Sequence, residues 1–222
     1  MLELLTLTIP NFGVMTRLMK NQPKLVKKDG YHHGDLRAQL VEATRQLVEE
    51  VGPDHFSVSE ACRRAGVSTA APYRHFKTKD DMLAAVLADG MWRHYDEMRT
   101  CVEEHPPATL DRIRALGRTY VDFALREPGV FRLIFGSRSG LESMKDELVE
   151  SIRPLEVVEN EVAAILGRTD HDADVVRRAF LLWTFVHGLS FLLIDKKQKL
   201  DALGVDIESA LDEVATRVMQ DS

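Results

Sequence analysis

The segment FSVSEACRRAG, residues 56–66, constrains the fold of this 222-residue sequence more than any other. Ser57 followed by Glu60 predicts a capping box at the start of a helix, and Gly66 supplies the backbone freedom that a tight turn needs. The small or apolar residues between them recur at i, i+3, i+4 and i+7, as on one helix face: Val58, Ala61, Cys62 and Ala65. A second short helix is predicted from Ser68 through about Phe76. Two short helices joined so closely must cross steeply over small side chains, which predicts a helix-turn-helix unit.

The flanking sequence has helical periodicity on both sides of this unit. Apolar residues predict a helix over 35–51, which Gly52-Pro53 ends, and Thr78 with Asp81 caps a longer helix that runs past Trp92. No strand-like alternation is present in the sequence. Beyond residue 100 the helical pattern continues, with breaks at His105-Pro106-Pro107, Glu127-Pro128-Gly129, Gly136-Ser-Arg-Ser-Gly140, Gly167 and Gly204.

We therefore predict an all-α fold, in which a three-helix N-terminal domain precedes a larger helical bundle that dimerises. Residues 1–30 are expected to be an extension with a basic arm. Residues 31–82 are expected to form the helix-turn-helix domain, with a linking helix to about residue 99. Residues 100–222 are expected to form the C-terminal domain.

The distribution of charge is uneven along the chain. The net charge of −6 argues by itself against a nucleic-acid partner. Residues 1–80, however, hold 12 Lys and Arg against 9 Asp and Glu, a net charge of +3, and the remainder carries −9. A chain with a basic N-terminal part and an acidic remainder can orient its basic part toward a polyanion such as DNA.

Polar side chains surround the predicted turn and fit a DNA contact. A helix in the major groove needs short residues near base edges, as at Thr69 and Ala70, and flanking groups that reach phosphates. Lys79 opens the next helix, where its charge and the helix N-terminus both favour a phosphate. The predicted DNA-binding residues are Lys27, Lys28, Ser57, Ser59, Ser68, Thr69, Ala70, Tyr73, Arg74, His75 and Lys79.

Residues 31–90 resemble the DNA-binding domain of the TetR/AcrR family of bacterial transcriptional regulators. The resemblance rests on the string A-G-V-S-x-x-x-x-Y-x-H-F-x-x-K-x-x-[LM], which begins at Ala65. It implies that Tyr73 and Lys79 contact phosphates, and that the ring of Phe76 packs into the small domain's core. Pro72 lies in the first turn of the expected recognition helix, where its missing N–H forfeits a hydrogen bond, so the start of that helix stays open.

The stretch WTFVHG, residues 183–188, resembles the Trp-His-Gly signature of one class of regulator C-terminal domain. The resemblance implies that the helix around 173–195 and the last helix pair with their copies in a four-helix dimer interface. The expected interface residues are Trp183, His187, Gly188, Phe191, Leu211, Val214 and Val218. It also implies a pocket for a small-molecule effector, and the aromatic and methionine content of residues 90–190 suggests that this effector is apolar or aromatic. The expected pocket residues, all of which would also suit a helical core, are Trp92, Tyr95, Met98, Tyr120, Phe123, Phe131, Phe135, Trp183 and His187.

Two functions of different classes follow from these observations. The first is a ligand-released repressor that acts as a homodimer on near-palindromic operator DNA. The second is a protein-interaction module that keeps this fold without a metabolite effector. No paired carboxylates, nucleophile–base set or metal-ligand spacing is credible, so we expect neither an enzyme nor a cofactor.

Three other motifs have structural explanations. Residues 169–174, TDHDAD, lack the glycine and glutamate of a calcium loop and suit a helix N-cap. The Gly136–Gly140 stretch lacks the ending of a phosphate-binding loop and suits an inter-helix loop. His32-His33 with Asp35 are expected to precede the first helix rather than to bind a metal.

The compartment is expected to be the cytoplasm. The two cysteines, Cys62 and Cys101, are too few to predict a disulfide framework. No apolar run is expected to reach the length of a membrane span. The N-terminal residues carry Glu3 and no basic region ahead of the apolar stretch, unlike a signal peptide. Met15 or Met19 are alternative starts, and residues 1–23 are expected to be a poorly ordered extension or a partner-binding helix.

Overall fold

The computed structural model describes residues 36–136, 141–195 and 205–220, and all regular structure there is helical. The prediction of an all-α fold is therefore confirmed for this part of the chain. In chain order the elements are α2 (Leu36–Val51), α3 (Val58–Arg64), the 3-10 turn η1 (Pro72–Arg74), α4 (Lys79–Glu104), α5 (Leu110–Arg126), α6 (Pro128–Phe135), α7 (Glu142–Ile152), α8 (Pro154–Ile165), α9 (Ala173–Ile194) and α11 (Ile207–Met219).

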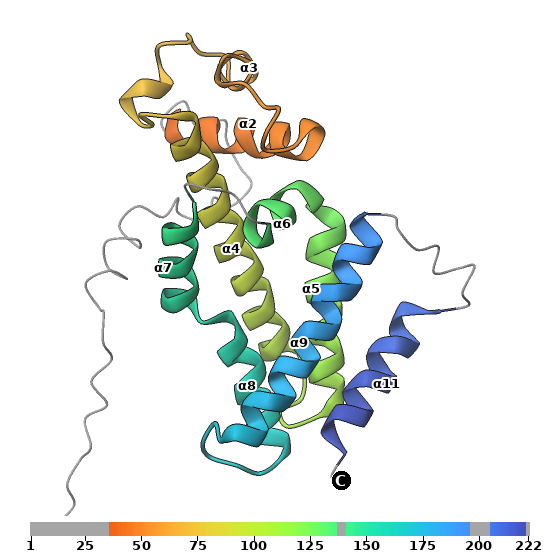
Figure 1. Cartoon of the computed structure of the whole chain (residues 1–222). Coiled ribbons are helices and arrows are strands. Elements are labelled where there is room, and N and C mark those ends of the chain that lie inside the picture. Colours follow the sequence, from red (N-terminus) through yellow and green to blue (C-terminus); the bar gives the residue numbers. More distant parts are fainter. Residues whose placement is uncertain (1–35, 137–140, 196–204, 221–222) are drawn as a thin grey trace, which may run out of the picture.

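The small N-terminal unit consists of α2, α3, η1 and the start of α4, and it lies at one end of the molecule (Figure 1). Its core residues include Leu40, Phe56, Cys62 and Phe76, all of which are buried. The backbone of Gly66 has a φ of +69°, a left-handed conformation that favours glycine. The N–H of Val67 then donates to the carbonyl of Cys62 at 2.9 Å, which closes the turn after α3 as the sequence indicated.

Helix capping fixes where the helices of this unit begin. Ser57 Oγ accepts a hydrogen bond from the N–H of Glu60 at 3.1 Å, but the Glu60 carboxylate pairs with Arg63, so only half of the predicted capping box forms. At the start of α4, Thr78 and Asp81 form the complete reciprocal box. Such caps satisfy N–H groups that the first helical turn cannot pair internally.

The predicted second helix of the helix-turn-helix unit is shorter than expected. Only Pro72–Arg74 is helical, as a 3-10 turn, and its cap position is Ala71 rather than Ser68. Pro72 has no N–H to donate to the carbonyl of Ser68, which an α-helix would require. Instead the N–H of Ala71 donates to Ser68 at 3.0 Å, and the N–H groups of His75 and Phe76 both converge on the Pro72 carbonyl at 2.8 Å.

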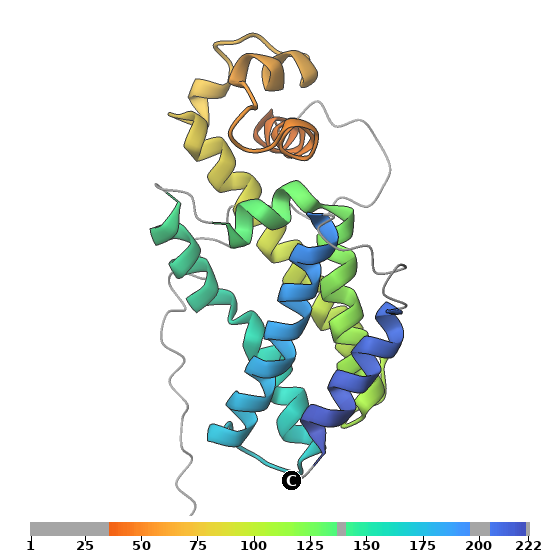
Figure 2. The same cartoon turned by 45° about the vertical axis from the view of Figure 1, so that its right-hand side comes forward.

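The larger unit is a bundle in which α5 and α9 pack together, α8 lies along α9, and α11 contacts both α5 and α9. The long helix α4 runs from the small unit into this bundle (Figure 2). Met82 and Leu83 are buried near its start, and Met98 and Cys101 are buried near its end. One rigid helix is therefore common to both units.

Helix α6 is wedged against α2 and α4 through two glycines. A Cβ atom on Gly129 would lie 2.5 Å from the carbonyl oxygen of Val48 on α2. A Cβ atom on Gly90 of α4 would lie 2.4 Å from a methyl group of Val130. These contacts leave no room for a side chain, so α6 is fixed closely between the two units.

Helix α9 departs from one expectation drawn from the sequence. Among the described residues, α9 is long and apolar enough to cross a membrane. Within the protein, 39% of an apolar 18-residue stretch of this helix is buried. Core helices of soluble proteins meet the same test. In this structure α9 packs against α5, α8 and α11.

The acidic segment 170–174 caps α9, as the sequence indicated. Asp172 accepts hydrogen bonds from the N–H groups of Asp174 and Val175, at 2.9 and 3.0 Å. Asp174 pairs with Arg177 and Arg178. Among the described residues no group of three His, Cys, Asp or Glu side chains could hold a metal ion, while His32 and His33 lie outside those residues.

Candidate DNA-binding surface and effector cavity

The predicted DNA-contacting side chains gather at the far end of the small unit. Figure 1 shows α3 and the following turn at this end, remote from α8 and α11. Among the described residues, Tyr73 is the most exposed large hydrophobic residue, with 64% of its surface exposed. The other exposed members of the predicted set are Ser57, Ser59, Ser68, Thr69, Ala70, Arg74 and His75. Lys27 and Lys28 lie outside the described residues.

Lys79 is held in place before any ligand arrives. Its Nζ donates to the carbonyl of Asp54 at 3.0 Å and lies 4.6 Å from the centre of the Phe56 ring. Its ammonium group therefore remains beside the start of α3, near Ser57. A phosphate oxygen that approaches α3 would meet this cation already positioned.

Two cations beside this surface were absent from the predicted set. Lys77 is exposed directly before α4, and the guanidinium of Arg37 lies 5.4 Å from the centre of the Phe76 ring. Lys77 occupies an unspecified position of the quoted motif, so only its place between Phe76 and Lys79 could have indicated it. The position of Arg37 depends on how α2 packs, which the motif does not encode.

A charged cluster connects the small unit to the bundle. Glu127 at the α5–α6 junction is 5% exposed, and its carboxylate accepts hydrogen bonds from Arg93 on α4 and, at 3.4 Å, from Arg45 on α2. On α2, Glu49 accepts from the N–H groups of Gly129 and Val130, both at 2.8 Å. These N–H groups belong to the first turn of α6, where the helix dipole favours a carboxylate. From the sequence, only a helix break is predicted at this junction.

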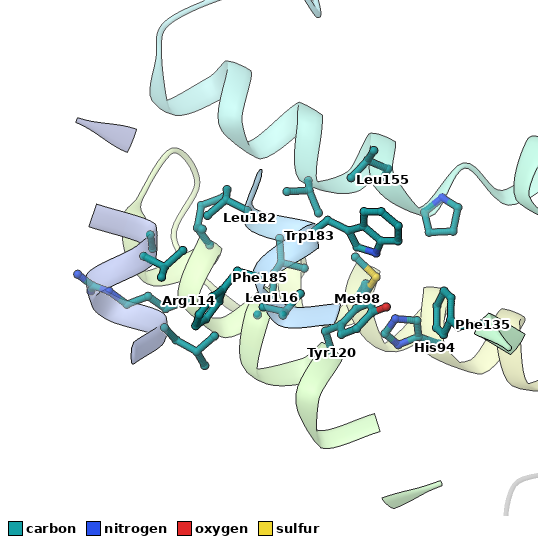
Figure 3. A pocket seen from close by; sticks show the side chains of 18 of the residues that line it. His94, Met98, Arg114, Leu116, Tyr120, Phe135, Leu155, Leu182, Trp183 and Phe185 are labelled. Atoms are coloured by element: carbon teal, nitrogen blue, oxygen red, sulfur yellow. The ribbon is translucent and has the colours of Figure 1, made fainter. Parts of the chain in front are cut away.

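An apolar cavity of about 270 Å³ lies inside the bundle. It is bounded by α4, α5, α6, α7, α8, α9 and α11, and Figure 3 shows its side chains. Four of the expected pocket residues line it: Met98, Tyr120, Phe135 and Trp183. Most of the other lining residues are aliphatic, among them Met91, Ile113, Leu116, Leu155, Val158, Leu182, Val186 and Leu211.

The other five expected pocket residues lie outside this lining. Phe123 and Phe131 are fully buried in the core, and Trp92 packs edge-to-face on Tyr95 with their ring centres 6.0 Å apart. His187 faces Tyr120, and its Nδ1 lies 2.8 Å from the Tyr120 hydroxyl. Burial raises the pKa of Tyr120, so the hydroxyl stays protonated and can share this hydrogen bond with either tautomer of His187.

His94 lines the cavity, although it was absent from the predicted pocket residues. The side chain is 4% exposed, and within the described part of the protein neither ring nitrogen has a hydrogen-bond partner. Its ring stacks on Phe123 and meets Tyr120 edge-on, with ring centres 4.6 and 4.9 Å apart. Burial, with a smaller contribution from the charge of Arg126, lowers the pKa of His94 to about 4. The imidazole is therefore neutral near pH 7.

The apolar surface left open on α9 differs from the predicted dimer interface. Trp183, Leu211 and Val214 line the cavity, and Val218 is half-buried in the bundle. His187 and Phe191 pack on each other, with ring centres 5.1 Å apart, and both rings also pack against Phe131. The exposed stripe instead consists of Val176, Phe180, Leu181, Thr184, Gly188 and Leu192, of which only Gly188 was predicted. We call these six residues the α9 stripe.

Two sequence families match this chain. The family described as bacterial regulatory proteins, tetR family, matches residues 40–86, which span the helix-turn-helix unit. The family described as tetracyclin repressor-like, C-terminal domain, matches residues 113–218, which span most of the bundle. The chain belongs to the TetR family. It is therefore a DNA-binding transcriptional regulator, as the motif in α3 to α4 indicated. The Trp-His-Gly subtype stays a prediction.

Curated relatives of this TetR-family regulator match it over part of their length. The HTH-type transcriptional activator FasR of Mycolicibacterium smegmatis is 32% identical over 102 residues, 45% of this chain and 45% of FasR. The match therefore spans less than half of that relative. The nucleoid occlusion factor SlmA of Vibrio atlanticus is 27% identical over 139 residues, 62% of this chain and 69% of SlmA. By their names these two relatives are a transcriptional activator and a nucleoid occlusion factor, and neither is named as an enzyme.

Solved structures share the fold over most of the chain. A protein of unknown function from Rhodococcus sp. RHA1 has a TM-score of 0.70 and 27% identity, and covers 86% of this chain and 97% of its own. The transcriptional regulator FadR of Bacillus subtilis, in complex with stearoyl-CoA, has a TM-score of 0.64 and 16% identity, with coverage of 82% and 97%. At that identity the likeness to FadR concerns the fold alone.

Proposed function

We propose that this TetR-family regulator is a ligand-released repressor, which binds near-palindromic operator DNA as a homodimer in the cytoplasm. The observation that carries the proposal is the apolar cavity beside α4, because α4 also forms part of the small unit's core. Met91, His94 and Met98 face the cavity, whereas Met82 and Leu83 lie at the other end of the same helix. A ligand that shifts α4 therefore shifts the DNA-binding surface.

The second route from the cavity to DNA runs through α6. Ile134 and Phe135 line the cavity at the end of α6, and Glu49 on α2 holds the beginning of α6. An effector that binds more tightly to one position of α4 and α6 would select that position throughout the molecule. Such coupling between two sites is typically worth about 1–3 kcal/mol.

The proposed dimer joins the α9 stripe of one copy to the α9 stripe of the second. The apolar residues Val176, Phe180 and Leu192 are exposed along α9, in a stripe that follows i+4 steps and therefore winds gradually around the helix. Apart from Gly188 itself, its two chain neighbours and the adjacent α9 backbone, no described atom lies within 4 Å of the position that a Gly188 Cβ would occupy. A partner helix can therefore approach the backbone there closely. A two-fold interface uses the same stripe on both copies, which suits a near-palindromic operator.

An apolar effector is part of the same proposal. The cavity wall is mainly aliphatic and aromatic, so the transfer of apolar surface from water drives binding. The FadR structure was obtained with stearoyl-CoA, which supports a ligand that has an apolar part. The alternative, an interaction module without an effector, expects no cavity large enough for a metabolite, and the cavity of about 270 Å³ therefore favours the regulator with an effector.

Transcription in vitro tests the proposal, including its sign. A template that carries the regulator's own promoter is transcribed with and without the purified protein, and then with extracts of apolar metabolites. We expect the protein to lower transcript yield and an active extract to restore it. A rise in transcript yield on addition of the protein alone would contradict repression, and would assign an activating role instead.

A further inference from the structure

The cavity wall contains few polar groups, and most of them are already paired. The Tyr120 hydroxyl is hydrogen-bonded to His187, and Lys145 Nζ donates to the carbonyl of Gly136. The guanidinium of Arg114 pairs with Asp111 and Asp212, so its charge is balanced, although its Nε has no partner among the described residues. His94 differs from these groups because neither of its two polar atoms has a partner among the described residues.

His94 lines the cavity and carries two hydrogen-bonding atoms that are unused among the described residues. Both ring nitrogens lack a partner within the described residues, although the side chain is 4% exposed. A buried polar atom without a partner is destabilising, and such atoms in native proteins call for an explanation. The stacking on Phe123 and the edge contact with Tyr120 hold the ring at a fixed angle but satisfy neither nitrogen.

We propose that His94 forms a hydrogen bond to a neutral carbonyl, amide or hydroxyl group of the effector, whose remainder is apolar. This proposal rests on the function proposed above, since it requires that the cavity bind an effector. A neutral imidazole offers one N–H donor and one acceptor nitrogen, which matches such a group. It offers no charge to balance a carboxylate buried at the same place.

The placement of His94 also defines the orientation of the effector. In Figure 3, His94, Met98 and Phe135 lie at one end of the cavity, and Arg114 and Leu182 lie toward the other. The lining on α5 extends from Ile113 to Tyr120, which at the α-helical rise is a distance of roughly 10 Å. The effector's polar group is thus placed at the His94 end, and its apolar body extends roughly 10 Å toward α11.

The test uses four probes of equal chain length on the full-length protein: 1-octanol, 2-octanone, octanoate and octane. Trp183 lines the cavity, so the change in its fluorescence reports binding. For the unaltered protein we expect the alcohol and the ketone to bind more tightly than octane and octanoate. In His94→Phe, which keeps the ring and removes both nitrogens, we expect the alcohol and the ketone to lose affinity about tenfold, while octane loses none.

Two further variants separate a binding role from a structural one. Met98→Leu changes the cavity wall without altering any hydrogen-bonding atom, and should change the affinities of all four probes by similar factors. His94→Gln keeps a donor and an acceptor, and should recover part of the preference for alcohol over octane. Recovery in His94→Gln also guards against a folding defect in His94→Phe.

The possible failures are distinguishable. If none of the four probes binds, the effector cavity of the proposed function fails, and this inference fails with it. If all bind but His94→Phe leaves the preference for alcohol over octane unchanged, only the role of His94 is overturned. If octanoate binds most tightly and depends on His94, the proposed neutral group is wrong.

Discussion

Replacing Glu49 by glutamine tests the connection between α2 and α6. The Glu49 carboxylate accepts hydrogen bonds from the N–H groups of Gly129 and Val130, both at 2.8 Å, at the positive end of the α6 dipole. Hydrogen bonds to a charged group contribute about 1.5–3 kcal/mol, against about 0.5–1.5 kcal/mol for neutral pairs. The dipole interaction adds about 0.3–1 kcal/mol. Glu49→Gln should therefore weaken the attachment of α6 to α2 by about 2 kcal/mol.

Amide hydrogen exchange measures this loss at the helix itself. If α6 opens locally, a change of about 2 kcal/mol raises the exchange rate of its first amides by about 30-fold. The measurement is the deuterium uptake of a peptide that covers α6. Glu50→Gln is the matched control, because Glu50 is the next residue, is exposed and pairs with Arg64 instead. Unchanged uptake in Glu49→Gln, or an equal rise in both variants, would refute the reasoning.

Three further predictions concern the DNA surface, the dimer and the buried histidine. Lys79→Ala should weaken binding to all DNA sequences and lower the slope of log affinity against log salt by about 1, as measured by anisotropy titrations. The remote variant Arg217→Ala should change neither the affinity nor the slope. Phe180→Lys should raise the dimer dissociation constant, measured by sedimentation, by more than about 100-fold, because each of the two symmetric copies loses about 1.5–3 kcal/mol of apolar burial. The control Leu125→Lys should leave that constant unchanged. Burial lowers the pKa of His94 to about 4 in the folded protein, against about 6.5 in the unfolded chain. As the pH falls below about 6.5, the unfolded chain therefore binds a proton that the folded protein does not bind. The free energy of unfolding then declines between pH 6.5 and pH 4. Urea unfolding at pH 5 should show about 2 kcal/mol less stability than at pH 7, and His94→Phe should remove most of that difference.

The helices of the small unit were predictable because their signals are local. The caps at Ser57 and Thr78 and the turn at Gly66 each depend on residues fewer than five positions apart. The expected recognition helix is shorter than the helical pattern predicts, because the missing N–H of Pro72 outweighs that pattern. A 3-10 turn forms where one α-helical hydrogen bond is impossible.

The cavity and the connection to α6 were less predictable, because they depend on tertiary packing. The identity of an aromatic residue does not determine whether it faces a cavity, as Trp183 does, or the filled core, as Phe123 does. His94 stands at i, i+4 from Met98 on the buried face of α4, and this spacing was the available signal. Glu49 and Gly129 are 80 positions apart, a distance over which periodicity carries no information.

Footprinting of the regulator's own promoter, at two salt concentrations, tests the central claim most directly. The account predicts protection of a near-palindrome whose half-sites are centred about 34–36 Å apart, or a multiple of that distance, on one face of the DNA. The protection should weaken but remain sequence-specific at the higher salt concentration. Protection that ignores sequence and disappears with salt would contradict an operator-binding dimer, and would favour the interaction module.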